Sequence, residues 1–353
     1  MSHLKPFNLF RYAVLTLGLV VLAACQPKAE PEMVTLSGQT MGTTYTVKYI
    51  VEPSQTLPDP VAVKAEIDKR LQQVNQEMST YIPSSEISRF NQMTGCSETA
   101  PCNMTIAQDF ATVVGEAIRI NAVTQGALDI TVGPVVNMWG FGPDKEVIKA
   151  PSPEQLAKVR PIIGIDKIFL HQNTLSKKAA GVYIDLSSIA KGFGVDKIAF
   201  YLDELQLNNY LVEIGGELRA KGHNLQSQPW SIGIEHPSVL QHQSNQLVIP
   251  LENMAMATSG DYRNFRMDDT GHRLSHIINP QTLAPISHRL ASITVVHGST
   301  MTADGLATGL FVLGEQKALD IAEKEHLPVF LIIQTGDKFE TKMSSAFKAL
   351  LKQ

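Results

Sequence analysis

Three polar clusters in this sequence contain residue types that could bind a polar ligand or a metal ion. The first runs from Asp185 to Gly192, with an acid at the end of an expected strand and Lys191 about one turn into the helix that follows. Free backbone N–H groups and the positive end of a helix dipole meet at such a junction, which favours polar ligand atoms. Plain helix capping explains this segment equally well.

The second cluster is Asp304-Gly305-Leu306-Ala307-Thr308. A carboxylate and a hydroxyl four residues apart lie on one face of a helix and can reach one site. Hard oxygen ligands of this kind suit Mg²⁺, with waters and substrate phosphate oxygens completing its shell. The alternative is structural, because an acid near a helix N-terminus is favoured by the dipole and the threonine can face the interior.

The third cluster is His276-Ile277-Ile278-Asn279-Pro280, where an expected strand ends at proline and the histidine could face a cleft. Most single histidines are structural, so the segment alone does not assign a catalytic role. The run from Ser259 to Arg263, after an expected strand at 256–258, leaves the same two interpretations open.

The elements that must position these clusters follow from hydrophobic period and capping. Helices and mostly antiparallel strands are mixed without strict βαβ alternation, so we expect an α+β fold with flanking helices. Ser187 and Ser188 are candidate N-caps of a helix that ends near Leu205. The expected elements are a strand pair in 34–51, helices at 61–78, 106–124, 300–313 and 316–326, strands at 166–170 and 181–185, mostly strands from 210 to 297, and a C-terminal hairpin turning at 335–337.

Several function classes lose support from absent motifs. The chain has no H-E-x-x-H, no G-x-S-x-G and no P-loop, which argues against zincins, α/β-hydrolases and P-loop enzymes. Gly192-Phe193-Gly194 lacks the third glycine of a dinucleotide fingerprint, and close helix packing explains it better. The net charge of −4 and the lack of a basic run give no support for nucleic-acid binding.

The N-terminus is typical of a bacterial lipoprotein. Lys5 and Arg11 precede an apolar run at 13–24 that is short for a membrane span, and Cys25 directly follows Ala-Ala. We therefore expect a signal peptide at 1–24, a diacylglycerol-modified Cys25, a flexible tether at 25–33 and one catalytic domain at 34–353. An uncleaved anchor helix is the alternative. Without 1–24 the chain has 329 residues, with 28 basic and 34 acidic side chains.

Two further cysteines, Cys96 and Cys102, lie in a polar stretch beside Gly95 and Pro101. In an oxidising envelope compartment a disulfide that pins this loop is expected. A metal or redox pair is the alternative, but the C-x-x-C spacing and a nearby histidine are both missing.

Taken in order, these segments resemble the ApbE family of FAD:protein FMN transferases, over nearly all of the chain after Cys25. No single block decides the resemblance, but their shared order does. The blocks are Thr40-Met41-Gly42-Thr43, Ser79-Thr80-Tyr81, Gly126 to Pro134, Trp139-Gly140-Phe141, Asp185 to Gly192, Ile214-Gly215-Gly216, Thr258 to Arg263, His276 to Pro280, and Thr302 to Thr308.

The resemblance implies an enzyme that cleaves FAD and attaches FMN through a phosphoester to a Thr or Ser of an acceptor protein, releasing AMP. His276 matches the family's catalytic position. Mg²⁺ would be held by Asp304 and Thr308, with Ser188 and Ala307 contributing through backbone or water. FAD contacts would fall on Met41, Tyr81, Ala127, Leu128, Asp129, Asp185, Lys191 and Ile278.

The sequence departs from the family pattern at two positions. Asn279 stands where an aspartate is common, so the charge near His276 differs, and Ala307 stands where some members have a carboxylate. The alternative functions are an FAD pyrophosphatase that yields FMN and AMP, and a non-catalytic flavin-binding lipoprotein.

The resemblance also implies partners and a location. The acceptors would be subunits of membrane redox complexes, such as the Na⁺-translocating NADH:quinone reductase or a related electron-transport complex. A lipid anchor at Cys25 would hold the enzyme in the bacterial cell envelope, facing the periplasm, and raise its encounter rate with membrane-bound acceptors.

Overall fold

The computed structural model describes residues 30–143, 150–237, 245–261, 265–267, 273–336 and 338–352. Cys25, the expected signal peptide, Tyr262 and Arg263 lie outside these ranges. Within them, no helix combines the length and apolar character needed to cross a bilayer. Strand β1 begins at Glu32, two residues inside the segment expected to be a tether.

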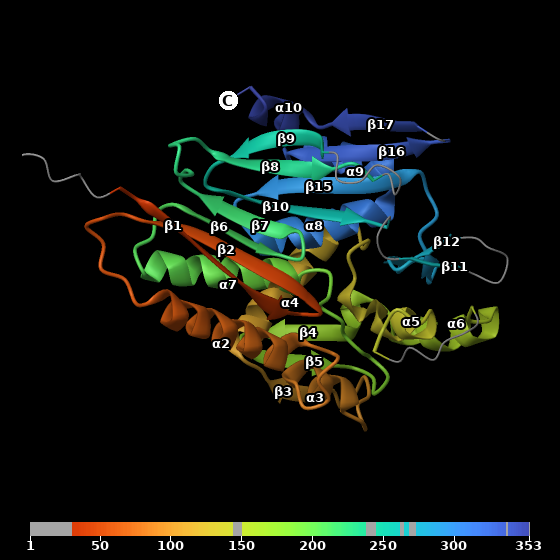
Figure 1. Cartoon of the computed structure of the whole chain (residues 1–353). Helices are drawn as coiled ribbons and strands as arrows, with labels where there is room; N and C mark the ends of the chain where they lie inside the picture. Colours follow the sequence, from red (N-terminus) through yellow and green to blue (C-terminus); the bar gives the residue numbers. More distant parts are fainter. Residues whose placement is uncertain are drawn as a thin grey trace, which may run out of the picture.

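An antiparallel sheet of eight strands forms the frame of the molecule (Figure 1). Tyr45, Val47 and Tyr49 are buried while the residues between them are more exposed, the two-residue period of a strand with one face on a core. In sheet order the strands are β1 (Glu32–Thr40), β2 (Thr43–Val51), β6 (Tyr210–Ile214), β7 (Glu217–Lys221), β10 (Met254–Gly260), β15 (Leu290–His297), β16 (Val329–Thr335) and β17 (Lys338–Met343).

Both faces of the sheet are covered in its second half. Ile293 and Val295 pack into a core built with the helices, whereas Val296 and Ile332 pack into a core on the opposite face. Because both faces are covered, nearly all residues of β15 are buried, and the strand does not alternate between buried and exposed residues. The opposite face is covered by the hairpin of β8 (Trp230–Glu235) and β9 (Asn245–Leu251) and by α10 (Ser345–Leu350).

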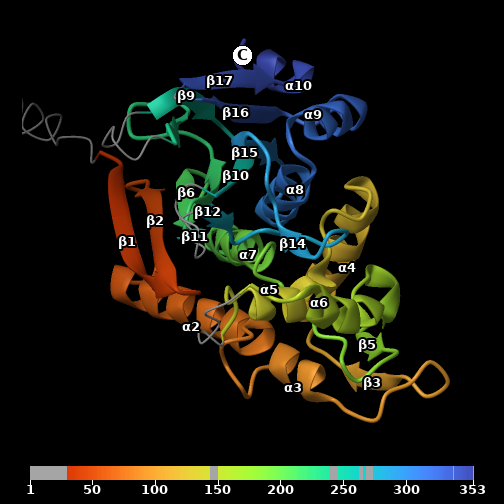
Figure 2. The same cartoon turned by 90° about the vertical axis from the view of Figure 1, so that its right-hand side faces the viewer.

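Helices α7 (Ala190–Glu204) and α8 (Thr300–Leu313) lie between the sheet and a lower layer (Figure 2). Helix α8 is buried almost all round because the sheet, α7 and α4 surround it. The surrounding elements are α2 (Pro60–Met78), α3 (Glu86–Gln92), α4 (Gln108–Val123), α5 (Gly133–Met138), α6 (Pro153–Val159), α9 (Glu315–Lys324), the sheet of β3 (Cys102–Thr105), β5 (Thr174–Lys177) and β4 (Ile168–His171), and the short pairs β11 (Phe265–Met267) with β12 (Arg273–Ser275) and β13 (Ile278–Asn279) with β14 (Ala284–Pro285).

The α+β prediction is confirmed, as are the N-terminal hairpin, the expected long helices and the Cys96–Cys102 disulfide. The predicted strand at 181–185 is wrong, since side chains and a loop take up its backbone groups in place of a neighbouring strand. Ser187 and Ser188 do not cap α7, which begins at Ala190; Ser187 instead donates to Asp185. The short helices α3, α5 and α10 are not among the predicted elements.

Candidate active site

A cavity of about 310 Å³ brings the three polar clusters together. Its wall combines residues from the start of α7, one side of α8, the end of β10, the segment 276–278 that leads into β13, and the loop after α4. The sequence-predicted residues that line it are Tyr81, Ala127, Leu128, Asp129, Asp185, Ser188, Lys191, His276, Ile278, Asp304 and Thr308. Residues separated by more than two hundred positions therefore share one site.

Helices α7 and α8 cross in close contact at the site. A Cβ atom on Gly192 would lie 2.4 Å from the Thr300 carbonyl oxygen and 2.8 Å from Cβ of Asp304, so only glycine fits. The Gly192 N–H donates to Oδ2 of Asp304 at 2.9 Å. The packing role expected for this glycine is confirmed, and the same contact sets the metal-site candidate against the start of α7.

Asp196, one turn further along α7, fixes the register of this crossing. Its buried carboxylate accepts hydrogen bonds from Ser299 Oγ at 2.7 Å, from the N–H and hydroxyl of Thr300 at 3.0 and 2.8 Å, and from the Met301 N–H at 3.0 Å. Arg219 on β7 supplies the counter-charge at 2.8 Å. The free N–H groups of α8 are thus satisfied by a side chain of α7, which holds Asp304 opposite Lys191.

Three ionisable side chains of the cavity affect one another's pKa values. Lys191 Nζ lies 2.5 Å from Oε2 of Glu217, which is buried. Burial raises the pKa of Asp304 to about 7, the charge of Glu217 adds to this rise, and Lys191 and the Gly192 N–H oppose it. Burial lowers the pKa of Lys191, but the charges of Asp304 and Glu217 outweigh burial and leave that pKa above its ordinary value. Lys191 is thus a cation held by two acids.

Glu217 is a cavity residue that the sequence analysis missed. It follows the tight turn at Gly215 and Gly216, both with positive φ, and opens β7. The sequence signal for this residue is an acid directly after a glycine turn, at the start of a strand. Nothing in the spacing of Glu217 and Lys191 along the chain reveals that they form a pair.

Two carboxylates of the cavity are held by the same pattern of local hydrogen bonds. Oδ1 of Asp129 accepts from the N–H and hydroxyl of Thr131 at 2.8 and 2.6 Å, and Oδ1 of Asp185 accepts from the N–H and hydroxyl of Ser187 at the same two distances. Each acid is therefore oriented by the residue two positions later, an Asx turn. Burial raises the pKa of Asp129, against the hydrogen bonds from Thr131.

Helix α4 supports the loop that carries Ala127, Leu128 and Asp129. The Asn121 amide donates to the Leu128 carbonyl at 2.7 Å, and the Thr124 hydroxyl accepts from the Leu128 N–H at 3.0 Å. A Cβ on Gly309 of α8 would lie 2.7 Å from Cγ2 of Thr124 and 3.1 Å from Cβ of Leu128. Close packing against Gly309 therefore fixes the position of the loop 127–129, which lines the cavity.

Aromatic rings border the cavity. Tyr81 is 58% exposed although it lines the wall, so its ring face is available for stacking on a planar ligand. Burial of its hydroxyl, and then the charge of Asp185, raise the pKa of Tyr81. The His276 ring meets the Phe141 ring edge-on, with centroids 6.4 Å apart.

Two predicted residues do not line this cavity. Met41, at φ 50° in the hairpin turn, lies against Gly194 and faces a second, more open hollow beside α2. Ala307 is fully buried in the core between α8 and its neighbours. Ser259, for which the sequence allows a structural or a functional role, lines the cavity, and its hydroxyl lies 3.2 Å from that of Thr308.

The donor set fits a hard cation that keeps part of its water shell. Asp304, Thr308 and Ser188 offer one carboxylate and two hydroxyls to the cavity. Among the described residues there is no cluster of three His, Cys, Asp or Glu side chains that could hold a metal ion by themselves. A cation here would need oxygen atoms from water or substrate, which is how Mg²⁺ is commonly bound beside phosphates.

Comparison with known proteins agrees with this geometry. The FAD:protein FMN transferase of Haemophilus influenzae is 55% identical over 333 residues, 93% of this chain and 94% of that protein. The FAD:protein FMN transferase of Vibrio cholerae is 49% identical, covering 95% of this chain and 97% of that protein.

Solved structures show the same likeness. The flavin transferase ApbE from Vibrio cholerae matches with a TM-score of 0.83 and 48% identity, over 91% of this chain and all of that one. The apo Pseudomonas stutzeri flavinyl transferase ApbE also has a TM-score of 0.83, at 34% identity, over 93% of this chain and 99% of that one. The ApbE family model matches residues 41–331, which include every cavity residue named above. This chain therefore belongs to the ApbE family.

Proposed function

We propose that this chain is an FAD:protein FMN transferase that requires Mg²⁺ and releases AMP. The observation that carries the proposal is the single cavity in which the oxygen donors of α8, the Lys191 cation and the Tyr81 ring face the same space. Relatives with this fold are named for the same transfer. A dinucleotide with a planar flavin and a charged pyrophosphate uses each of these groups.

In this proposal Asp304, Thr308 and Ser188 would hold the magnesium ion. When bound, Mg²⁺ would neutralise pyrophosphate charge and stabilise the leaving AMP as a Lewis acid. Lys191 would attract the phosphates, and its pairing with Glu217 and Asp304 keeps it protonated. Tyr81 would stack on one ring of FAD, which positions the substrate at little entropic cost.

The reaction replaces the phosphoanhydride bond between FMN and AMP with a phosphoester bond to the acceptor. The acceptor's Ser or Thr oxygen forms a bond to the FMN phosphorus while the bond from that phosphorus to the AMP oxygen breaks. The hydroxyl proton passes to a base, for which His276 in the cavity wall is the candidate. General base catalysis of this kind contributes roughly 10²–10⁴ in rate. Near-normal single-turnover transfer by His276→Ala would remove His276 from this role.

An assay with FAD, Mg²⁺ and an acceptor peptide that contains a candidate threonine tests the proposal. Flavin fluorescence that stays on the peptide after denaturation supports transfer. Free FMN and AMP without labelled peptide would instead establish a pyrophosphatase, and unchanged FAD would establish a binding protein. The same peptide with alanine in place of threonine is the matched control.

We further propose that Cys25 is lipidated and that the acceptors are envelope-facing subunits of membrane redox complexes, such as the Na⁺-translocating NADH:quinone reductase. The sequence pattern around Cys25 supports this proposal. The expected result is that the protein fractionates with membranes and that Cys25→Ser releases it in soluble form. Equal membrane association of both forms would contradict the anchor.

A further inference from the structure

The segment 182–185 leads directly into the cavity but belongs to no sheet. Val182 and Ile184 are fully buried in the core, and Asp185, with the opposite orientation along the chain, lines the cavity. A slide or rotation of this segment would therefore move a carboxylate of the ligand site. What holds its backbone is thus a question about the site as well as about the core.

Asn91, at the end of α3, takes the place of a neighbouring strand. Its side-chain amide donates to the Ile184 carbonyl at 2.9 Å and its side-chain oxygen accepts from the Ile184 N–H at 2.8 Å. One side-chain amide thus pairs with both backbone groups of one residue, as a peptide group does in a ladder. The Asp185 N–H then donates to the Ile130 carbonyl at 2.8 Å.

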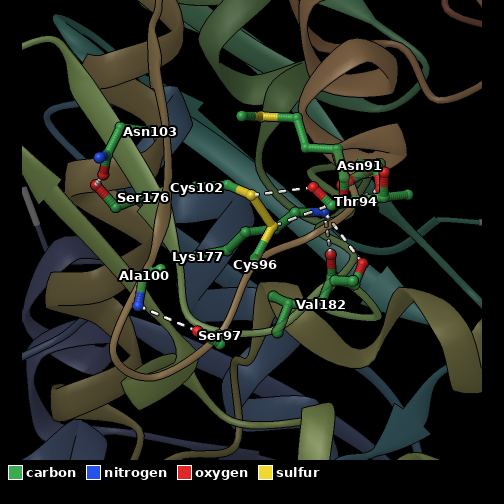
Figure 3. The surroundings of a disulfide bond; sticks show 12 residues. Asn91, Thr94, Cys96, Ser97, Ala100, Cys102, Asn103, Ser176, Lys177 and Val182 are labelled. Atoms are coloured by element: carbon green, nitrogen blue, oxygen red, sulfur yellow. Dashed lines mark hydrogen bonds between the residues drawn. A yellow bond between two sulfur atoms is a disulfide. The ribbon is translucent and has the colours of Figure 1, made fainter.

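Lys177, in the central strand β5 of the three-stranded sheet, is the second support. Its side chain is fully buried, and its amine donates to the carbonyls of Val182 at 3.0 Å, Asn91 at 2.9 Å and Ala180 at 3.3 Å. Figure 3 shows Lys177 between Asn91 and Val182, beside the disulfide. The amine lies 5.3 Å from the centroid of the Phe90 ring. Three carbonyls and one ring face therefore surround this ammonium group.

This arrangement is costly for a purely structural contact. Burial alone lowers the pKa of Lys177 to about 8. No carboxylate of the described residues pairs with the amine. An apolar residue would fill the same core position without a desolvation cost. The amine does what an apolar side chain cannot do, since it ties the backbone on both sides of the segment, at Asn91 and at Val182.

We infer that Lys177 and Asn91 are positioning residues for the reaction, which hold the 182–185 backbone so that Asp185 and the turn to Ser188 meet the substrate in the right place. The inference rests on the proposed function for its substrate, FAD. It assigns the two residues no contact with the ligand. They act through Asp185.

The test compares Lys177→Met with Lys178→Met, which is the same change one position along. The Lys178 amine is near the surface, over the Phe169 ring and 3.6 Å from Glu98. FAD affinity is measured by fluorescence titration at a temperature where circular dichroism shows both variants to be folded. Lys177→Met should weaken FAD binding about tenfold, because the carbonyls of Asn91, Ala180 and Val182 lose their donor and the segment 182–185 shifts. Lys178→Met should stay within twofold of wild type.

A double-mutant cycle separates positioning from general destabilisation. If Lys177 acts through Asp185, Lys177→Met should weaken FAD binding far less in an Asp185→Ala background than in wild type. Equal losses in both backgrounds would overturn the inference. A folded Lys177→Met protein that binds FAD as well as Lys178→Met does would also overturn it.

If Lys177→Met does not fold, Asn91→Ala tests the same positioning role. It leaves the Lys177 amine with its carbonyl partners and removes only the two side-chain bonds to Ile184. The same loss of FAD affinity and the same dependence on Asp185 are expected, and unchanged affinity would overturn the inference. Because FAD binding is measured without an acceptor, a protein that binds FAD but transfers no FMN would refute the proposed function and leave this test intact.

Discussion

Lys177 is fully buried and Lys191 is partly buried in the cavity wall, and their surroundings shift their pKa values in opposite directions. Lys191 faces the cavity with Glu217 at 2.5 Å and Asp304 nearby, and its pKa is raised. Lys177 is bonded to backbone carbonyls alone, and its pKa is lowered to about 8. Formal opposite charges outweigh burial at Lys191, whereas the partial charges of carbonyl oxygens do not outweigh it at Lys177.

The difference separates two uses of a lysine side chain that is removed wholly or partly from solvent. Lys191 keeps its charge at neutral pH and is placed where a phosphate could share it with Glu217 and Asp304. Lys177 has no carboxylate partner in the described part of the chain, so its use is geometric, as a three-way donor that fixes backbone. Burial by itself therefore does not reveal which lysine belongs to the chemistry. The partners of each amine do.

The largest expected effect is at the acid that faces Lys191. Asp304→Ala should lower Mg²⁺-dependent FMN transfer by roughly 10²–10³-fold or abolish it, because the buried carboxylate of the donor set is lost. Turnover is followed with FAD and an acceptor peptide across a magnesium titration. Asp320→Ala, on the exposed side of α9, is the control. Full activity of Asp304→Ala would remove the metal assignment.

Lys191→Met should come next in size. Removal of the cation leaves Glu217 and Asp304 facing each other, and we expect a loss of about 3 kcal/mol in the free energy of unfolding at neutral pH, together with weaker FAD binding. Addition of Glu217→Gln should restore stability without restoring FAD affinity. If the double variant regains both, Lys191 serves only to neutralise Glu217 and the contrast with Lys177 disappears.

The Cys96–Cys102 disulfide lies beside Lys177 (Figure 3). Cys102 is in register opposite Lys177 in the β3–β5 pair. Cys96→Ala/Cys102→Ala should lower the free energy of unfolding by about 2 kcal/mol, the scale of a short closed loop, as measured by urea titration. The effect on FAD affinity should be smaller than that of Lys177→Met. A larger effect on affinity would mean that the loop closed by the disulfide, and not the Lys177 amine, holds Asp185 in position.

The smallest expected effect is a pH dependence of stability that the wild type should show relative to Lys177→Met. Its folded-state pKa of about 8 lies below the model-peptide value of 10.5, so between these values the unfolded chain binds more protons than the native protein. Stability should therefore rise with pH in this window. Relative to Lys177→Met, the wild-type free energy of unfolding should increase by about 1 kcal/mol per pH unit near pH 9.

Urea titrations of both proteins at pH 7.5, 8.5 and 9.5 provide the measurement for this difference. Other titrating groups are common to the two proteins and cancel. A constant difference over the range would mean that the Lys177 amine is not desolvated as the structure indicates. The disulfide must be kept oxidised throughout, because thiols exchange faster at high pH.

Local pattern was enough for much of the fold. The alternation in 34–51, the helical period of 61–78 and the run at 300–313 each express which face meets a core, and these elements form as expected. The failure at 181–185 has a physical reason. Val182 and Ile184 alternate with Tyr183 and Asp185 as in a strand, but Asn91 and Lys177 supply the backbone partners from elsewhere. No local signal records such partners.

By itself the sequence determined the residue types of the site, the family resemblance and the period of the main elements. Only the tertiary structure decided that Glu217 belongs to the site, that Gly192 must touch Asp304, and that Ala307 is enclosed in the core. The reason is that periodicity reports the face of one element, whereas charge coupling depends on distances between elements. The pKa values of Lys191, Lys177 and Asp304 are set by such distances and by burial, so one sequence carries lysines of opposite behaviour.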